Sequence, residues 1–321
     1  MANDRRSHRE IELEDALKHL FDCEEVGSAA SVDSLSGALQ VRGEQSTMIL
    51  GRLRSQGLAE PRGDVWLLTE DGQKSAMAMV RRHRLYETWL AQEEGVPIEE
   101  LHRRAQVEEH LLSLDQVDAF ANKLGNPRFD PHGDPIPTRD GEIPMARRVS
   151  LAEWDLRKPA MIEHVEDEPV SMYRGIVKDG LYAGMVLMEM ESLPDGGVSL
   201  TTDGRKLVVA PELLGMIHVD AVDQQKMMPE GVSRLSELAV GEEGVVYGLS
   251  AACYGPERRR LLDIGIVPGT RIRCQFQSPF GSPRSYQIRG ALFGFRDEQA
   301  DKVLLAPSCA ATNKNQANQE A

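Results

Sequence analysis

The strongest constraint on the fold is a change of pattern in the middle of the chain. Residues 10–124 place their apolar side chains at helical spacing, for example at Leu13, Leu17 and Leu20. Five helices are expected in this half, at about 10–26, 33–39, 44–56, 68–94 and 98–124. The next stretch, up to about Pro144, is rich in proline, glycine and aspartate, which is typical of a loop. Short strands and turns follow, so the sequence predicts an α+β multidomain protein.

A repeated motif divides the second half of the chain into two units. The sequence GLYAG at 180–184 matches GIVPG at 265–269, which lies 85 residues further on. The starts and the ends of the two units agree in the same way, and this predicts two small β-barrels of roughly 70 to 75 residues. The polar end of the chain is expected to be a disordered tail. The expected domain boundaries are 8–72, 73–144, 145–225, 230–308 and, for the tail, 309–321.

Residues 31–72 carry the order helix, glycine turn, helix and strand pair. This order predicts a winged helix-turn-helix, in which the helix at 44–56 enters the major groove of DNA and the turn at 62–64 forms the wing. Contacts to bases or phosphates are predicted for the start of that helix and for nearby arginines, namely Arg42, Gln45, Ser46, Thr47, Arg52, Arg54 and Arg62. The alternative is a three-helix packing unit with no nucleic-acid role.

The net charge of the chain, −14, argues against nucleic-acid binding, because phosphate contacts dominate such affinity. Between Asp33 and Lys74, however, six acidic residues stand against five basic ones, so this module is nearly neutral. Binding to double-stranded DNA would then depend on shape and on two modules in a dimer.

Two of the expected long helices carry metal-binding residue types at helical spacing. His83 and Glu87 are four residues apart and share one face of the first helix. The next helix repeats the pattern with His102, Gln106, Glu109 and His110. Such mixed nitrogen and oxygen sets suit Mn²⁺, Fe²⁺ or Zn²⁺, and the alternative is a solvated polar face. The linker histidine, His132, fits a packing or turn role equally well.

Apolar runs and cysteine spacing indicate the cellular compartment. No apolar run approaches the ~20 residues that a membrane span requires, and no apolar stretch follows the basic residues near the N-terminus. The four cysteines are scattered without a CxxC pair, which fits a reducing compartment. We therefore expect a cytoplasmic protein without a membrane anchor.

With these residues in hand, the chain resembles the diphtheria-toxin-repressor family of metal-dependent regulators over about residues 10–308. The second β unit, with GEEGVVYGLS and GIVPGTRIRC, resembles the ferrous-transport accessory protein A domain, an SH3-like barrel. The resemblance implies a helical metal-binding and dimerisation domain at 73–144 and SH3-like folds for both β units. The second SH3-like unit departs from the family, whose members usually have one or none.

The resemblance also implies two metal sites. One would use His83, Glu87 and His102, and the other Asp15, Gln106, Glu109 and His110. An acidic ligand from the first β unit is also implied, and Glu166 is the best match, with Asp167 or Glu168 as neighbouring alternatives. Gln106 stands where the family has cysteine or glutamate, and Lys18 stands where manganese sensors carry a second acid, which argues against a paired manganese cluster.

The function implied is a transcriptional regulator, by expectation a repressor, of manganese or iron homeostasis genes. One or two Mn²⁺ or Fe²⁺ ions per subunit would stabilise a homodimer bound to operator DNA. The alternative is a metal-binding interaction module without operator recognition. No hydrolase signature such as HExxH is present, so the chain is not expected to be an enzyme.

Overall fold

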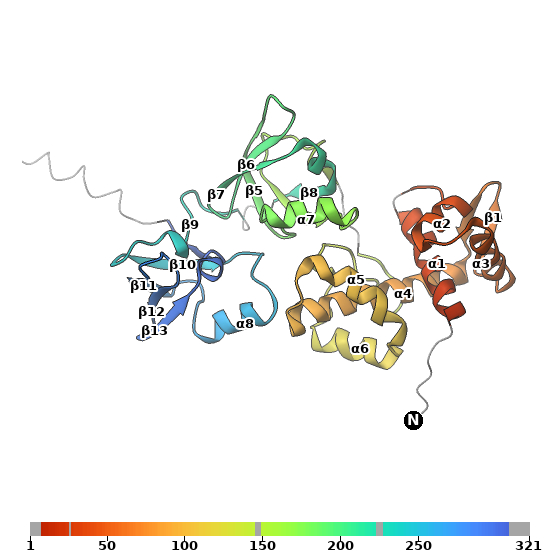
Figure 1. Ribbon diagram of the computed structural model, residues 1–321, viewed down its shortest axis with the longest axis horizontal. Coiled ribbons are helices and arrows are strands. Elements are labelled where there is room, and N and C mark those ends of the chain that lie inside the picture. Colours follow the sequence, from red (N-terminus) through yellow and green to blue (C-terminus); the bar gives the residue numbers. More distant parts are fainter. Residues whose placement is uncertain (1–7, 26, 145–148, 223–226, 308–321) are drawn as a thin grey trace, which may run out of the picture. The chain divides into compact units, whose positions relative to one another are not determined.

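The computed structural model describes residues 8–25, 27–144, 149–222 and 227–307, and the predicted tail at 309–321 lies outside these ranges. The chain has an α+β architecture, with helices in its first half and two antiparallel sheets in its second (Figure 1). It divides into two compact units. The N-terminal unit comprises Met1–Leu90 with Glu100–Met145, and the C-terminal unit comprises Ala91–Glu99 with Ala146–Ala321.

Three helices and a hairpin open the N-terminal unit. They are α1 (His8–Glu25), α2 (Val32–Leu39), α3 (Gly43–Ser55), β1 (Ala59–Arg62) and β2 (Val65–Leu68). The three helices pack on one another around a core that includes Leu20, Leu35 and Leu53. The expected helices and the hairpin turn are confirmed here. Ser31 caps α2 by accepting a hydrogen bond from the backbone of Ser34, which fixes where that helix begins.

The two long helices of the sequence prediction are shorter in the structure. The first is α4 (Glu70–Trp89), which continues into a π-helical turn at Leu90–Glu94. The second was expected to be one helix at 98–124, and this prediction was wrong. It consists of α5 (Ile98–Glu108), a 3₁₀ turn at Glu109–Leu111 and α6 (Leu114–Lys123). Ser113 and Gln116 form a capping box that starts α6 afresh.

The first sheet has six strands in the order β3-β8-β4-β5-β6-β7. Its strands are β3 (Val149–Ser150), β4 (Ala160–Val165), β5 (Val186–Ser192), β6 (Val198–Thr202), β7 (Arg205–Val209) and β8 (Ile217–Ala221). Helix α7 (Val170–Lys178) and a 3₁₀ turn at Pro211–Met216 complete this part of the chain.

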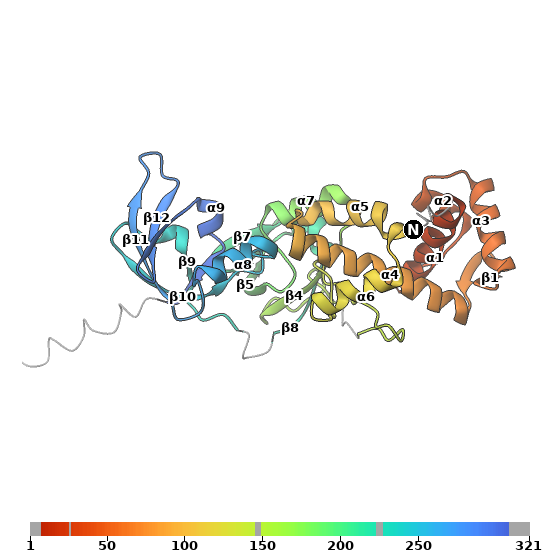
Figure 2. The same cartoon turned by 90° about the horizontal axis from the view of Figure 1, so that it is seen from below.

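The second sheet, of which Figure 2 labels β9, β10, β11 and β12, has its strands in the order β13-β12-β11-β10-β14-β9. Its strands are β9 (Ser233–Arg234), β10 (Glu243–Leu249), β11 (Arg271–Gln277), β12 (Arg284–Ile288), β13 (Ala291–Phe295) and β14 (Val303–Leu305). They are accompanied by a 3₁₀ turn at Leu235–Glu237, by α8 (Gly255–Asp263) and by α9 (Asp297–Ala300).

The two sheets share one topology, which confirms the internal repeat. Read from the other end, β9-β14-β10-β11-β12-β13 matches β3-β8-β4-β5-β6-β7 strand for strand. The central pairs also share an irregularity, because the register of β4 with β8 shifts between Ile162 and His164, and that of β10 with β14 shifts between Val246 and Gly248. Among the described residues, no helix is long and apolar enough to cross a membrane.

Candidate metal centre and nucleic-acid surface

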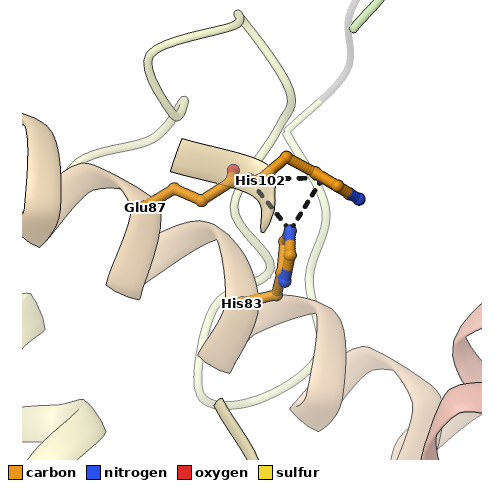
Figure 3. A group of neighbouring side chains, drawn as sticks. All are labelled: His83, Glu87 and His102. Atoms are coloured by element: carbon orange, nitrogen blue, oxygen red, sulfur yellow. Dashed lines mark hydrogen bonds and ion pairs between the residues drawn. The ribbon is translucent and has the colours of Figure 1, made fainter. Parts of the chain in front are cut away.

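Three predicted ligands come together in the N-terminal unit (Figure 3). His83 and Glu87 lie one turn apart on α4, and His102 reaches them from α5. The Nε2 atom of His83 is 3.0 Å from Oε1 of Glu87 and 3.2 Å from Nδ1 of His102, and the last two atoms are 3.4 Å apart. Donors around one ion bound at about 2.1 Å are separated by about 3.0 to 3.4 Å. We call these three residues the helical triad, and their spacing fits a single divalent ion.

Nearby histidines keep the buried carboxylate of the helical triad ionised. Burial would raise the pKa of Glu87, but charged His83 and contacts from His102 and His132 hold it well below its usual range. For His83, burial and the ammonium of Lys18 lower the pKa, yet Glu87 and Glu109 outweigh them and raise it overall. In the helical triad, the negative charge of Glu87 and the positive charge of His83 therefore stabilise each other.

Glu109 orients His83 of the helical triad from the other side of its imidazole ring. Its carboxylate contacts Nδ1 of His83, the ring nitrogen that does not face the other two ligands. A carboxylate in this position fixes the ring orientation of a metal-binding histidine. Burial raises the pKa of Glu109, but His83 and Lys18 lower it to about 2. Glu109 is completely buried and therefore acts as a fixed negative charge.

A second group joins the first helix to the 3₁₀ turn after α5. Nε2 of His110 lies 3.2 Å from Oδ1 of Asp15 on α1 and 3.6 Å from Oε1 of Glu109. We call Asp15, Glu109 and His110 the α1 group. On the other side of the ring, Nδ1 of His110 is 2.7 Å from Oε2 of Glu14. The sequence analysis did not single out Glu14, although it directly precedes Asp15.

Gln106 differs from the other predicted ligands because its side chain is exposed, whereas Glu109 and His110 are buried. The α-helix ends at Glu108 and a 3₁₀ turn follows, so the helical spacing that joined Gln106 to His110 does not continue through the turn. Its role as a ligand stays a prediction.

Two further side chains contact these groups. The Nζ atom of Lys18 is 3.0 Å from Nδ1 of His83 and 3.6 Å from Oε1 of Glu109, so a cation stands between the helical triad and the α1 group. His132 is buried, and its Nδ1 atom lies 3.7 Å from Oε2 of Glu87. The helical fold thus brings the linker histidine, which the sequence left without a role, next to a predicted ligand.

Glu166, the ligand expected from the first β unit, directly follows β4. Within the C-terminal unit it contacts two histidines, His164 on β4 and His218 on β8. Its role at the helical triad stays a prediction.

Most of the predicted DNA contacts lie on the surface of α3 and the hairpin. Arg42, Thr47, Arg54 and Arg62 are exposed, whereas Arg52 and Gln45 are half-buried. Gln45 donates a hydrogen bond to Glu12 on α1. Ser46 was wrongly predicted as a contact, because it is completely buried and its hydroxyl lies 2.8 Å from that of Ser36 on α2. It holds α2 and α3 together.

Comparison with known domains assigns two segments of the chain. Residues 69–138 match the iron-dependent repressor metal-binding and dimerisation domain, and residues 233–307 match the FeoA domain. The first match contains the helical triad, Glu109 and His110.

Protein relatives and solved structures indicate the same family. The iron-dependent repressor IdeR of Mycobacterium tuberculosis is 30% identical over 221 residues, which cover 64% of this chain and 95% of the relative. The diphtheria toxin repressor of Corynebacterium glutamicum is 26% identical over 220 residues, or 64% of this chain and 95% of the relative. A manganese-dependent transcriptional repressor in complex with manganese superposes with a TM-score of 0.60 at 28% identity, over 65% of this chain and all of the other.

The fold and the histidine–carboxylate groups define a metal-dependent transcriptional repressor, which is a class of regulators and not of enzymes. The chain belongs to the family of the iron-dependent and diphtheria toxin repressors.

Proposed function

We propose that divalent metal, bound at the helical triad and at the α1 group, switches this repressor into its DNA-binding form. The observation that carries the proposal is the position of Asp15. It lies on α1, within the three-helix module that bears the exposed arginines, yet its carboxylate is 3.2 Å from His110 after α5. A ligand shared by Asp15 and His110 would connect the DNA-binding module to the metal-binding helices.

In this proposal α1–α3 and the β1–β2 hairpin form a winged helix-turn-helix at 8–72, and 73–144 forms the metal-binding and dimerisation domain. The two sheets, at 145–225 and 230–308, are SH3-like barrels. Arg42 and Thr47 at the start of α3 would meet the DNA in its major groove, with Arg54 and Arg62 on phosphates. Their exposure supports these roles.

The electrostatics of the metal groups support a switch. Glu14, Asp15 and Glu109 bring three acidic side chains around His110, and Lys18 is the basic side chain that contacts Glu109. A bound divalent cation would supply positive charge and directional bonds to these oxygens and ring nitrogens. The chain's own residues then determine the effect, since Asp15 holds α1 in place and Glu109 orients His83.

The ligand chemistry favours Mn²⁺ or Fe²⁺. Both groups contain only imidazole nitrogens and carboxylate oxygens, and neither contains a cysteine. Hard and borderline donors of this kind suit Mn²⁺ and Fe²⁺, whereas thiolates select softer ions. Relatives described as iron-dependent and as manganese-dependent both match this chain, which supports the same pair of metals.

A homodimer is supported by an apolar strip beside the metal groups. Val107, Leu111 and Leu114 on α5, the 3₁₀ turn and α6 are each about two-thirds exposed, at 68%, 67% and 66%. Neighbouring apolar side chains this exposed are typical of a surface that a partner covers. The matched domain model is described as a dimerisation domain, which fits the same segment.

The test is binding to a labelled duplex from the gene's own upstream region, measured by fluorescence anisotropy with Mn²⁺, anaerobic Fe²⁺, Zn²⁺ or chelator. Wild type should bind only with metal. Glu109→Gln should lose at least about tenfold in metal-dependent affinity, because it removes the charge that orients His83 and faces His110. The variant Glu100→Gln, at a half-exposed position on α5, is the matched control and should bind like wild type.

The same assay distinguishes the alternative of an interaction module without operator recognition. Neutralising Arg42, Arg54 and Arg62 together should abolish operator binding and leave metal binding unchanged. If wild type binds metal but no duplex under any condition, operator recognition is excluded and the interaction module stands.

A further inference from the structure

A histidine–carboxylate cluster lies in the first sheet of the C-terminal unit. His164 is on β4, Glu166 directly follows β4, and His218 is on β8. Both Nε2 atoms point to the same oxygen, since Oε1 of Glu166 is 3.3 Å from that of His164 and 3.0 Å from that of His218. The two ring centroids are 5.5 Å apart. We call these three residues the strand triad.

Strand pairing, and not sequence spacing, builds the strand triad. His164 and His218 are directly paired across β4 and β8, at the point where the register shifts after Ile162. The backbone N–H of Glu166 donates to the carbonyl of Met216, which fixes the chain just beyond the pair. Both histidines and the carboxylate therefore project from a rigid hydrogen-bonded frame.

Each imidazole of the strand triad lies at the separation from the carboxylate oxygen that two ligands of one ion would have. The distances of 3.0 and 3.3 Å fall within the range of about 3.0 to 3.4 Å expected for neighbouring ligands at about 2.1 Å from a metal. Nε2 of His218 faces Glu166, whereas its buried Nδ1 atom has no hydrogen-bond partner within the described part of the chain. A buried polar atom in this state is costly unless a ligand satisfies it.

Access and charge also fit a cation. The side chain of His164 is only 3% exposed, whereas that of Glu166 is 39% exposed, so one side of the triad opens to solvent. The imidazoles of His164 and His218 hold the pKa of Glu166 below its usual range. The triad thus presents its carboxylate at the side that is exposed to solvent.

The second sheet shows that the fold does not need these side chains. By strand order and by the shared register shift, Gly248 on β10 occupies the place of His164, and Leu304 on β14 that of His218. Ser250, whose N–H donates to the carbonyl of Lys302, takes the place of Glu166. Apolar and small residues complete the same frame there, so packing alone does not account for the buried imidazole of His164 and the partly buried one of His218.

We propose that His164, Glu166 and His218 form a third metal site, which binds a first-row transition ion such as Zn²⁺ within the first sheet. Two imidazoles and one carboxylate with open positions are a ligand set that Zn²⁺ and Fe²⁺ accept. The site is independent of the helical triad and the α1 group, and it assigns Glu166 to its own β unit in place of the role that the family resemblance implied.

The test uses the full-length chain with the helical sites disabled by Glu87→Gln and Glu109→Gln. Chelator-treated protein is titrated with Zn²⁺ in equilibrium dialysis, and with Co²⁺ to follow its absorption bands. We expect one tightly bound ion per subunit in this background. Adding His218→Leu, which installs the residue of the second sheet, should weaken binding at this position more than about 100-fold.

Two further variants complete the design. Circular dichroism would reveal whether His218→Leu fails to fold. Glu166→Gln changes a half-exposed side chain, so it should weaken Zn²⁺ binding without disturbing the fold. Glu191→Gln, on the exposed face of β5, is the control and should bind like its parent. No bound ion in the disabled background, or equal binding with and without the strand triad, would overturn the proposal. Neither result affects the operator-binding test of the helical sites.

Discussion

The helical triad and the strand triad contain the same chemical groups in different frames. Each has two imidazoles and one carboxylate, with donor separations of 3.0 to 3.4 Å in the first and 3.0 and 3.3 Å in the second. The helical triad joins two helices and is surrounded by charged side chains. The strand triad spans two neighbouring strands and is open on its carboxylate side.

The surroundings determine what each triad can do. Glu109 contacts His83 of the helical triad and belongs to the α1 group, which includes Asp15 of the DNA-binding module. An ion at the helical triad can therefore influence α1 through a chain of direct contacts. The strand triad lies within hydrogen-bonded strands, and its frame recurs in the second sheet without metal-binding residues. In our proposal the first triad therefore serves switching, and the second stabilises a β unit.

The largest expected effect is a difference in operator affinity between variants of the two triads. His83→Ala removes a ligand and the partner of Glu109, so metal-dependent operator binding should fall more than about 100-fold. His218→Leu should change it less than about twofold. Anisotropy titrations at saturating Mn²⁺ measure both. A comparable loss in the two variants would show that the strand triad also takes part in switching.

A smaller effect is expected from Lys18, whose charge affects only the helical sites. The ammonium stands roughly 6 Å from an ion held by the helical triad, and even in water its repulsion is about 1 kcal/mol. Lys18→Met should therefore tighten Mn²⁺ binding at these sites about fivefold and leave the strand triad unchanged. Calorimetric titration measures both affinities, with Lys74→Met on the exposed face of α4 as control. Weaker Mn²⁺ binding would mean that Lys18 chiefly positions His83.

The smallest expected effect comes from His19, which lies outside both triads on α1. Burial lowers the pKa of His19, and its Nε2 is 3.0 Å from Oγ of Ser34. A histidine with a lowered folded pKa binds its proton more readily when unfolded, so it destabilises the fold as the pH falls below about 6.5. His19→Gln should remove about 1 to 2 °C of the decrease in Tm between pH 7.5 and 5.5, measured with chelator present. An unchanged decrease would assign acid sensitivity to other groups.

The difference between helix and strand also explains which of the two triads could be predicted from the sequence. The helical triad was found from the sequence because His83 and Glu87 are one turn apart, and the helical period is local information. The strand triad was missed, although His164 on β4 and Glu166 directly after β4 are only two residues apart. Their partner His218 is 52 residues beyond Glu166 and is brought in only by the pairing of β4 with β8.

Other differences between the sequence predictions and the structure have similar causes. The helix expected at 98–124 is interrupted because the capping box of Ser113 and Gln116 competes with helix continuation. Ser46 has the polarity of a DNA contact, but the packing of α2 on α3 buries it against Ser36. Glu14 and Lys18 acquire their roles only when α1 packs beside His83 and His110.

The sequence by itself determined the order of the elements, the repeated β unit and the ligands that share a helix, because each depends on residues close together in the chain. The tertiary structure alone decided that Asp15 meets His110, that Lys18 stands beside His83, and that His164 faces His218. These contacts depend on packing and strand register, and both are fixed by the burial of apolar side chains far apart in the sequence.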